Sequence, residues 1–355
     1  MGDVRVTVLG AGITGLTTAS RLLAAGCAVR VVAAAPIDAS TSYLAAAVWF
    51  PTHVGPADRV ADWGRRTYDM LAEQAARGVP GVVMRESLAL YREPPEEPDW
   101  AEAVRGVRPA TGAELPPGYR YGLRFVVPLV EMPLYLPWLA EQVRADGAVL
   151  CAHHVRSLRE LIEGGVDAIV NCSGLAAREL VGDRSVYPVR GQIARVTNPG
   201  LAMSIRDECH PEGRAYVHPR EHDCILGGTL DEHSWDTRVD LDTAESILRR
   251  CQDIAPALTD ASVIDHVVGL RPGRPTVRLE EDTPDEPGPR ILHNYGHGGA
   301  GITISWGCAD EVTSLLGGRR VKARPNPLSS STFSSVPPPA SPVWLASGSD
   351  HTSRY

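Results

Sequence analysis

The first chemical signal in the sequence is a glycine-rich turn with a GxGxxG pattern, placed between a strand-like run and a helical stretch. The first glycine permits a tight turn, the second lets the backbone approach a pyrophosphate, and the third lets helix and strand pack closely. Because a helix N-terminus also carries partial positive charge, the pattern predicts dinucleotide binding, although a purely structural strand–turn–helix has the same form. The predicted binding residues are Gly10, Gly12, Ile13, Thr14 and Gly15.

A second glycine-rich run, residues 293–303, follows a strand-like stretch and precedes the final helical stretch. A helix N-terminus aimed at a cofactor stabilises developing negative charge, which a reduced flavin acquires near its pyrimidine edge. Alone, the run could be a flexible loop. Two strand–glycine–helix anion sites in one chain indicate a two-part cofactor such as FAD.

One residue expected of such a cofactor site is missing. An acidic residue about 20 positions after the first glycines normally holds the adenosine ribose. Here the second strand-like run ends in Ala34, and the nearest acid is Asp38. The hydroxyl groups of Ser40, Thr41 and Ser42 are the alternatives, and the sequence does not choose among them.

A candidate substrate anchor lies between the two glycine-rich runs. Arg271 is followed by a proline, and an arginine fixed in this way offers a rigid fork for a carboxylate. Tyr216 could offer its hydroxyl group to the same carboxylate. A surface arginine in a turn and a core tyrosine are the alternatives.

His218 follows Tyr216 by two positions. If the two residues lie on a strand, their side chains share one face, so His218 is expected in the same pocket. An imidazole that titrates near neutrality would favour an acidic substrate side chain when protonated. A half-exposed histidine at a sheet edge is the alternative.

Composition excludes several classes of protein. Lys322 is the only lysine among 35 basic residues, which excludes Schiff-base enzymes and P-loop nucleotidases. Seven scattered cysteines without a CxxC pair support neither a disulfide framework nor a metal site. The net charge of −8 argues against nucleic-acid binding, and the lack of a long apolar run argues against a membrane span. With no signal segment at the start, a cytoplasmic protein is expected.

The elements that must position these residues alternate between strands and helices. A sequence resembling a capping box at 242–245 should open a helix that ends before Pro256, and Pro137 should kink or delay an earlier helix. The acidic stretch 280–289 is expected to be a turn, and glycines 317–318 to cap the last helix. The region 321–355, rich in Ser and Pro, is expected to be a disordered tail. Helices are expected at 62–77, 134–144 and 303–316, and strands at 4–9, 28–32, 168–172, 192–196, 224–227 and 291–294.

Several of these motifs together resemble the D-amino-acid oxidases. They are Arg190-Gly-Gln192, the Cys224–Thr229 strand, Gly269-Leu-Arg271-Pro and HNYGHGGAGIT at 293–303. The run Thr41–Trp49 is similar to that family's flavin-contacting loop, and Val170–Gly174 to its central FAD strand. The resemblance covers roughly residues 4 to 317, in the same order throughout.

The resemblance implies an α/β fold, in which a Rossmann-like FAD-binding domain is interleaved with an antiparallel-sheet substrate domain. The cofactor domain would comprise residues 1–55, 136–186 and 265–320, and the substrate domain 56–135 and 187–264.

The implied activity is the oxidative deamination of a D-amino acid by hydride transfer from its α-carbon to FAD, with O2 as the electron acceptor. Arg271 and Tyr216 would bind the substrate carboxylate and the Gly299 backbone its amine, while no side-chain base is required. The implied cofactor contacts are Gly10, Gly12, Ile13, Thr14, Gly15, Thr41, Ser42, Ala46, Ala47, Val48, Trp49, Val155, Cys172, Ser173, Gly174, Gly298, Gly299, Gly301 and Thr303. The implied substrate pocket consists of Val48, Thr52, Tyr216, His218, Arg271 and Gly299.

The sequence also departs from the family pattern. The segment before Tyr216 is too short for a long active-site lid, and Thr52 stands where a tyrosine is common, which predicts a roomier pocket. Three alternatives remain: a relative that oxidises D-aspartate or D-glutamate, one that oxidises glycine or N-methylated amines, and a flavin-binding protein without turnover. The predicted partners are a small-molecule D-amino acid and O2, and a homodimer is a further possibility.

Overall fold

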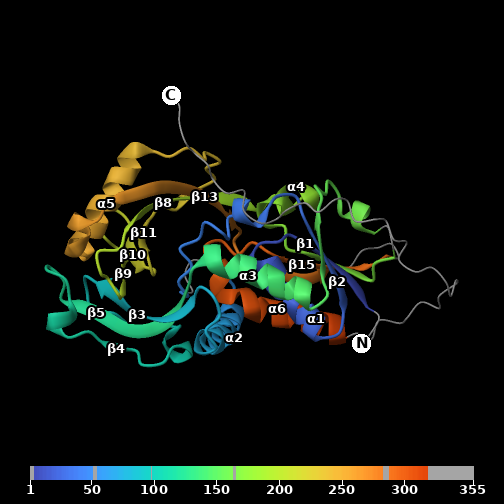
Figure 1. Cartoon of the computed structure of the whole chain (residues 1–355), viewed down its shortest axis with the longest axis horizontal. Helices are drawn as coiled ribbons and strands as arrows, with labels where there is room; N and C mark the ends of the chain where they lie inside the picture. Colours follow the sequence, from blue (N-terminus) through green and yellow to red (C-terminus); the bar gives the residue numbers. More distant parts are fainter. Residues whose placement is uncertain (1–3, 51–53, 97, 163–164, 283–287, 319–355) are drawn as a thin grey trace.

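The computed structural model describes residues 4–50, 54–96, 98–162, 165–282 and 288–318. Two sheets organise this chain, one toward each end of its long axis (Figure 1). Thr52 and the predicted tail at 321–355 lie outside the described residues.

The first sheet has six strands in the order β14-β15-β7-β1-β2-β6. All neighbouring strands run parallel except β14, which pairs antiparallel with β15 at the edge. The short runs rich in valine and isoleucine suit strands buried on both faces. The bounds are β1 Arg5–Leu9, β2 Ala28–Ala33, β6 Val149–Ala152, β7 Ala168–Asn171, β14 Arg278–Asp282 and β15 Arg290–Tyr295.

Helices α1, α3 and α6 lie side by side on one face of this sheet, and together with α2 they form the largest core cluster with it. Helix α1 packs on α6 and α3, and α6 also packs on α2 (Figure 1). In the described ranges, no helix is long and apolar enough to cross a membrane. The helices are α1 Ile13–Ala24, α2 Ala57–Ala76, α3 Met132–Ala145 and α6 Gly301–Gly318, together with the short α4 Ala177–Leu180.

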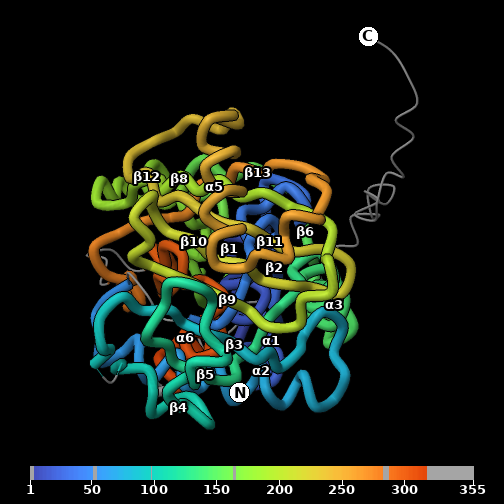
Figure 2. Tube along the Cα trace, turned by 90° about the vertical axis from the view of Figure 1, so that its left-hand side faces the viewer, coloured from blue at the N-terminus to red at the C-terminus, as the bar shows by residue number. Residues whose placement is uncertain are grey.

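The second sheet has nine strands and faces the viewer in Figure 2. Its main order is β12-β8-β11-β10-β9-β3-β5-β4, and β13 pairs with the other side of β8. Helix α5, Leu241–Ile254, packs over β8, β10 and β11. The bounds are β3 Val82–Tyr91, β4 Arg108–Pro109, β5 Tyr121–Val130, β8 Tyr187–Thr197, β9 Ser204–Asp207, β10 Ala215–Pro219, β11 Asp223–Gly227, β12 Asp231–Glu232 and β13 Val263–Gly273.

Helix boundaries differ from the sequence expectations at several ends. Helix α5 begins two residues early, because the carboxylate of Asp240, and not that of Asp242, accepts the backbone N–H of Thr243 at 2.7 Å. Helix α3 begins at Met132 with Pro137 inside it. Pro137 falls just after the first turn, so only one helical hydrogen bond near the N-terminus is lost. Helix α6 continues through glycines 317–318 instead of ending before them.

The acidic stretch predicted as a turn from residue 280 is instead a strand as far as Asp282. Arginines neutralise its acidic side chains: Arg278 pairs with Glu280 at 2.7 Å, and Arg290 with Glu281 at 2.7 Å. Charged side chains are well tolerated on an edge strand such as β14. The predicted domain boundary at 265 also falls within β13, which pairs with β8 along almost its whole length.

Candidate active site

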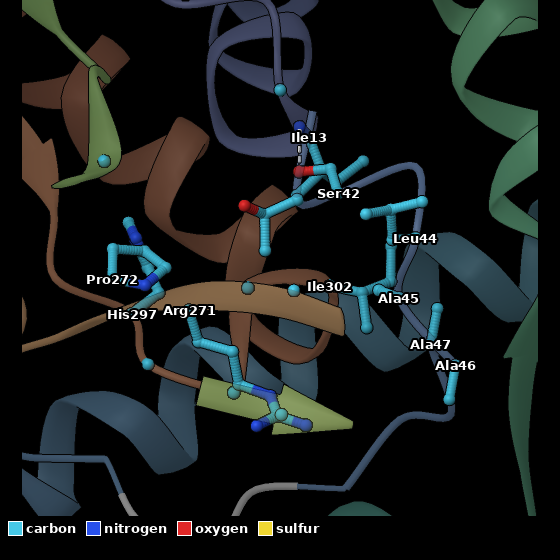
Figure 3. A pocket seen from close by; sticks show the side chains of 18 of the residues that line it. Ile13, Ser42, Leu44, Ala45, Ala46, Ala47, Arg271, Pro272, His297 and Ile302 are labelled. Atoms are coloured by element: carbon cyan, nitrogen blue, oxygen red, sulfur yellow. Dashed lines mark hydrogen bonds between the residues drawn. The ribbon is translucent and has the colours of Figure 1, made fainter. Parts of the chain in front are cut away.

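A cavity of about 500 Å³ lies where the two sheets meet. The six-stranded sheet contributes the segments that follow the carboxyl ends of β1, β7 and β15, and the nine-stranded sheet contributes residues of β8, β9, β10 and β13. Figure 3 shows Ser42 and Leu44–Ala47 along one side of this pocket and Pro272 and His297 along the other. In open α/β sheets, ligands bind beyond the carboxyl ends of the strands, so this position suits a cofactor.

The GxGxxG turn forms the first end of the cavity. Gly10 adopts a φ of +113°, and a Cβ on Gly15 would lie 1.9 Å from the Gly10 carbonyl oxygen, so helix α1 packs directly on the turn. The Ser42 hydroxyl accepts the Ile13 N–H at 3.0 Å, and a Cβ on Gly12 would approach that hydroxyl to 3.0 Å. The turn is therefore a backbone cradle that any larger residue would fill.

Ser40, Thr41 and Ser42, the three hydroxyl-bearing candidates for the ribose, all line the cavity. Ser40 donates to the Ile37 carbonyl at 2.6 Å, and Thr41 donates to the Leu270 carbonyl at 3.0 Å. The exposed Ala34 contributes nothing to the cavity wall. A hydroxyl oxygen can accept two hydrogen bonds, and none of the three accepts more than one here, so the choice among the three stays open.

The second glycine-rich run forms the other end of the cavity, where α6 begins at Gly301. The Gly298 N–H donates to the Pro272 carbonyl at 2.8 Å, which joins this run to β13. His297 forms a 3.1 Å hydrogen bond with Asn294, and complete burial lowers its pKa to about 4. The ring is therefore neutral at physiological pH, and it adds no fixed charge near the N-terminus of α6.

Arg271 reaches the cavity from β13 (Figure 3). Its Nη1 donates to the Thr229 carbonyl at 3.0 Å, and within the described residues it forms no ion pair. A Cβ on Gly191 would lie 2.2 Å from the guanidinium. The side chain of Arg271 can therefore lie across β8 only because residue 191 is glycine. Gly299 adjoins the same side chain, since its Cβ position is 3.7 Å from Arg271 Cδ.

Tyr216 and His218 share one face of β10, as their spacing predicts. Their rings stack with centroids 4.8 Å apart, and both line the cavity. Burial raises the pKa of Tyr216, whose ring lies against Gly227 on the neighbouring strand.

His218, however, does not titrate near neutrality as expected. Burial, followed by the positive charge of Arg206, lowers the pKa of His218 well below its ordinary value. The ring is neutral, and among the described residues its Nδ1 has no hydrogen-bond partner. The lowered pKa disfavours the protonated ring, so it gives no support to the expectation that a protonated His218 attracts acidic substrates.

Three charged residues of the cavity wall were missed by the sequence reasoning: Arg206, Glu208 and Arg214. Arg206 Nη1 lies 3.9 Å from Glu208 Oε1, and Arg214 Nε lies 2.8 Å from Glu208 Oε2. The Arg206 guanidinium is almost fully buried, 3.7 Å from the centre of the Phe50 ring, and burial lowers its pKa. The available signal was the two-residue spacing of Arg206, which lies in β9, and Glu208, which lies just beyond the end of that strand; such a spacing puts both side chains on one side of an extended chain.

Most of the other predicted cofactor residues line the cavity, but four do not. Gly15 packs on the turn behind the cradle, as described above. The Trp49 indole donates to the Gly64 carbonyl at 3.0 Å within a separate aromatic cluster, and Val155 belongs to a small apolar cluster under β2. Thr303 exchanges hydrogen bonds with the Phe50 backbone. The part of the chain that the structure describes contains no cluster of three or more metal-ligating side chains.

The residues present fit a flavin dinucleotide. The cradle of Gly10, Gly12 and Ile13 suits the pyrophosphate, and the N-terminus of α6 suits the pyrimidine edge of the flavin ring. Small residues (Ala45, Ala46) line the wall between these two ends and leave room for the flavin.

Comparisons with known proteins agree with this arrangement. The chain is 50% identical over 315 residues to a D-amino-acid oxidase of Rubrobacter xylanophilus, which covers 88% of this chain and 96% of that protein. It is 36% identical to a D-aspartate oxidase of Homo sapiens, over 89% of this chain and 95% of that protein. Among solved structures, a glycine oxidase from Geobacillus kaustophilus superposes with a TM-score of 0.73 at 22% identity, covering 90% of this chain and 96% of that one.

At 22% identity, the glycine oxidase shows a shared fold only. The family match is more specific, because residues 5–315 match the DAO family, described as FAD dependent oxidoreductase. That match spans both sheets and every segment of the cavity wall described above. The chain therefore belongs to the family of FAD-dependent oxidoreductases, and its cofactor is FAD.

Proposed function

We propose that this chain is a D-amino-acid oxidase and that Arg271 anchors the substrate carboxylate. FAD, when bound, accepts the hydride of the substrate α-carbon and passes the electrons to O2, which yields hydrogen peroxide. The observation that carries the proposal is a guanidinium without a carboxylate partner among the described residues, placed beside Gly299 at the flavin end of the cavity. The two relatives named as D-amino-acid and D-aspartate oxidases support it.

The side chains of the cavity bind and orient the substrate. Arg271 offers two parallel N–H groups to the carboxylate, and the Tyr216 hydroxyl lies on the same wall as a further donor. The Gly299 backbone lies beside this anchor, where it can meet the substrate amine. The lowered pKa of His218 makes its imidazole a weak base, and orientation of the α-C–H bond is the main contribution of the protein.

The test is to isolate the protein with its cofactor and add single amino acids with and without oxygen. D-alanine should bleach the flavin absorbance anaerobically and produce peroxide in air, whereas L-alanine should do neither. Glycine and N-methylglycine are included to test the corresponding alternative. A flavin that is reduced neither by these amino acids nor by D-aspartate and D-glutamate would contradict the proposal and favour a binding protein without turnover.

A second candidate is oxidation of dicarboxylic D-amino acids, which the charges of the cavity favour. Arg206 and Arg214 supply two positive charges, Glu208 supplies one negative charge, and Arg271 adds a third positive charge. A monocarboxylate that pairs with Arg271 leaves the buried Arg206, among the residues that the structure describes, with only a 3.9 Å ion pair to Glu208 and the Phe50 ring. A second carboxylate would satisfy this guanidinium, because burying a charge is costly unless it is paired.

Matched pairs of substrates test this second candidate. D-glutamate and D-glutamine have the same shape and differ in one charge, as do D-aspartate and D-asparagine. If Arg206 receives the second carboxylate, kcat/KM should favour the acid over its amide in at least one pair. A preference for the amide in both pairs would contradict the proposed specificity for dicarboxylic D-amino acids, and it would not affect the proposal that the chain is a D-amino-acid oxidase.

We also propose a cytoplasmic homodimer. The seven cysteines are all free, which suits a reducing compartment. Trp235 and Leu241 expose large apolar side chains near one another in sequence, as contact surfaces often do. Light scattering of the purified protein and cell fractionation would test the two parts separately.

A further inference from the structure

Arg250, on helix α5, is a buried arginine that lies outside the cavity. Only 4% of the residue is exposed, and within the described residues it forms no ion pair with a carboxylate. Burying a guanidinium in this way is costly unless its N–H groups find other acceptors. Desolvation by burial accordingly lowers the pKa of Arg250.

The acceptors of Arg250 are mainly backbone carbonyls of two separate segments. Its Nε donates to the Arg214 carbonyl at 2.6 Å, and its Nη2 donates to the Gly228 carbonyl at 2.9 Å. Its Nη1 is 3.4 Å from the Glu212 carbonyl and donates to the Ser246 hydroxyl on its own helix at 3.2 Å. One rigid group therefore joins the end of β11 to the start of β10.

Both of these segments form walls of the substrate site. The ring of Tyr216 lies so close to Gly227 that a Cβ there would be 2.1 Å from it, and the Thr229 carbonyl accepts the 3.0 Å hydrogen bond of Arg271. Gly228, which Arg250 holds, is the residue between these two contacts. The second segment that Arg250 holds, at the start of β10, contains Arg214, whose side chain forms part of the cavity wall.

We propose that Arg250 is a positioning residue whose guanidinium fixes the Gly227–Thr229 segment relative to β10, and thereby sets the spacing of Tyr216 and Arg271. The proposal rests on the proposed role of those two residues in carboxylate binding. Arginine suits this task because its planar fork presents donors in fixed directions, so it can bridge two segments where a lysine would reach only one.

The experiment compares the holoenzymes of Arg250→Ala and Arg250→Lys with the wild type. Two properties are measured: kcat and KM for the best D-amino acid, and the affinity for propionate, followed as a change in flavin absorbance. We expect propionate affinity and kcat/KM to fall by about 10- to 100-fold in Arg250→Ala, because a displacement of about 1 Å in a site has such an effect. The propionate affinity and kcat/KM of Arg250→Lys should lie between those of the wild type and Arg250→Ala.

Two further measurements separate positioning from simple structural support. Millimolar guanidinium should restore part of the lost propionate affinity in Arg250→Ala, and FAD affinity should stay within about threefold of the wild type. The control is Arg249→Ala. Arg249 is the exposed neighbour of Arg250 on helix α5, and it pairs with the carboxylate of Glu212 at 2.8 Å, in the segment that Arg250 also contacts. It should change neither property more than twofold.

Propionate binding within twofold of the wild type in both Arg250 variants would overturn the proposal. An equal loss of FAD and propionate affinity, without rescue, would also overturn it and indicate general loosening of the fold. If Arg250→Ala does not fold, Arg250→Lys alone carries the test. Because propionate binding needs no turnover, the result stands even if the wild type oxidises no D-amino acid.

Discussion

The two sides of the cavity recognise their ligands by different means. The side formed by the six-stranded sheet presents glycines, backbone N–H groups and helix N-termini, with few charged side chains. The side formed by the nine-stranded sheet presents three arginines, a glutamate, a tyrosine and a histidine. The first side thus relies on backbone that cannot change its chemistry, and the second on side chains that single substitutions can replace. The cofactor should therefore be a fixed property of this fold and the substrate an adjustable one.

The largest effect expected on the substrate side is that of Arg271→Ala. Removing the carboxylate anchor should lower kcat/KM for D-amino acids by about 10³-fold, or about 4 kcal/mol, because a charge-assisted pair is lost in a desolvated site. FAD content, measured by absorbance, should be unchanged. Arg271→Lys keeps the charge without the fork and should recover only part of the activity. Turnover within a few-fold of the wild type in Arg271→Ala would remove this residue from the carboxylate site.

On the cofactor side, Gly15→Ala should weaken FAD binding, which Arg271→Ala should leave unchanged. The added Cβ would lie 1.9 Å from the Gly10 carbonyl, so the turn must shift. We expect FAD affinity to fall by about 100-fold and the free energy of unfolding of the apoprotein by about 1–3 kcal/mol, as for other overpacked sites. Gly112→Ala is the control, because open space surrounds that residue. Unchanged FAD titrations in Gly15→Ala would show that the cradle tolerates movement.

Arg206→Met should change which substrates are used and leave the general activity in place. Methionine keeps much of the apolar volume against Phe50 and removes the charge. We expect kcat/KM for D-glutamate or D-aspartate to fall by about 10- to 100-fold relative to the matching amide, the cost of losing one buried charge partner. A parallel change for acid and amide would mean that Arg206 supports the wall without binding substrate.

His218→Leu should have the smallest effect, and one that does not depend on pH. Because the pKa of His218 is well below its ordinary value, the ring is neutral at both pH 6 and pH 8. Selectivity among D-alanine, D-leucine, D-glutamine and D-glutamate should therefore change by only a few-fold, equally at both values. A loss specific to D-glutamate at pH 6 would show that the ring is protonated in the working enzyme.

The same substitution should alter acid stability. A histidine with a lowered pKa in the folded state stabilises the protein above the unfolded pKa, near 6.5, and this stabilisation is lost as the pH falls below it. The free energy of unfolding of His218→Leu should thus decrease less than that of the wild type between pH 7 and pH 5. Urea titrations at the two pH values measure the difference.

The contrast between the two sides also explains what the sequence could predict. The cradle at Gly10 and the helix start at Gly301 are local patterns in which a few neighbouring residues make the whole site. The charges at Arg206, Glu208 and Arg214 come from β9 and from the connection between β9 and β10, and their meeting depends on the pairing of Tyr216 with Arg206 across those two strands. No local pattern encodes that register.

The burial of the Tyr216 and His218 rings was as hard to predict from the sequence as the meeting of these charges. The spacing of Tyr216 and His218 was sufficient to place both rings on one face. The lowered pKa of His218 was not predictable, because it depends on burial of the ring and on the guanidinium of Arg206 from another strand. The edge strand β14 was missed for a related reason, since Arg278 within the strand and Arg290 on the neighbouring β15 offset its acidic composition.

Strand β13 belongs to one sheet and yet serves both halves of the cavity. Its Leu270 carbonyl accepts the Thr41 hydroxyl, its Pro272 carbonyl accepts the Gly298 N–H, and Arg271 stands between them. A slip of one residue would turn Arg271 to the opposite face and break both links at once. The pairing with β8 is irregular only between Val263 and Asp265. We therefore expect a residue inserted next to Val263 to be absorbed by that irregularity, whereas one inserted between Val267 and Pro272 would separate the two halves of the cavity.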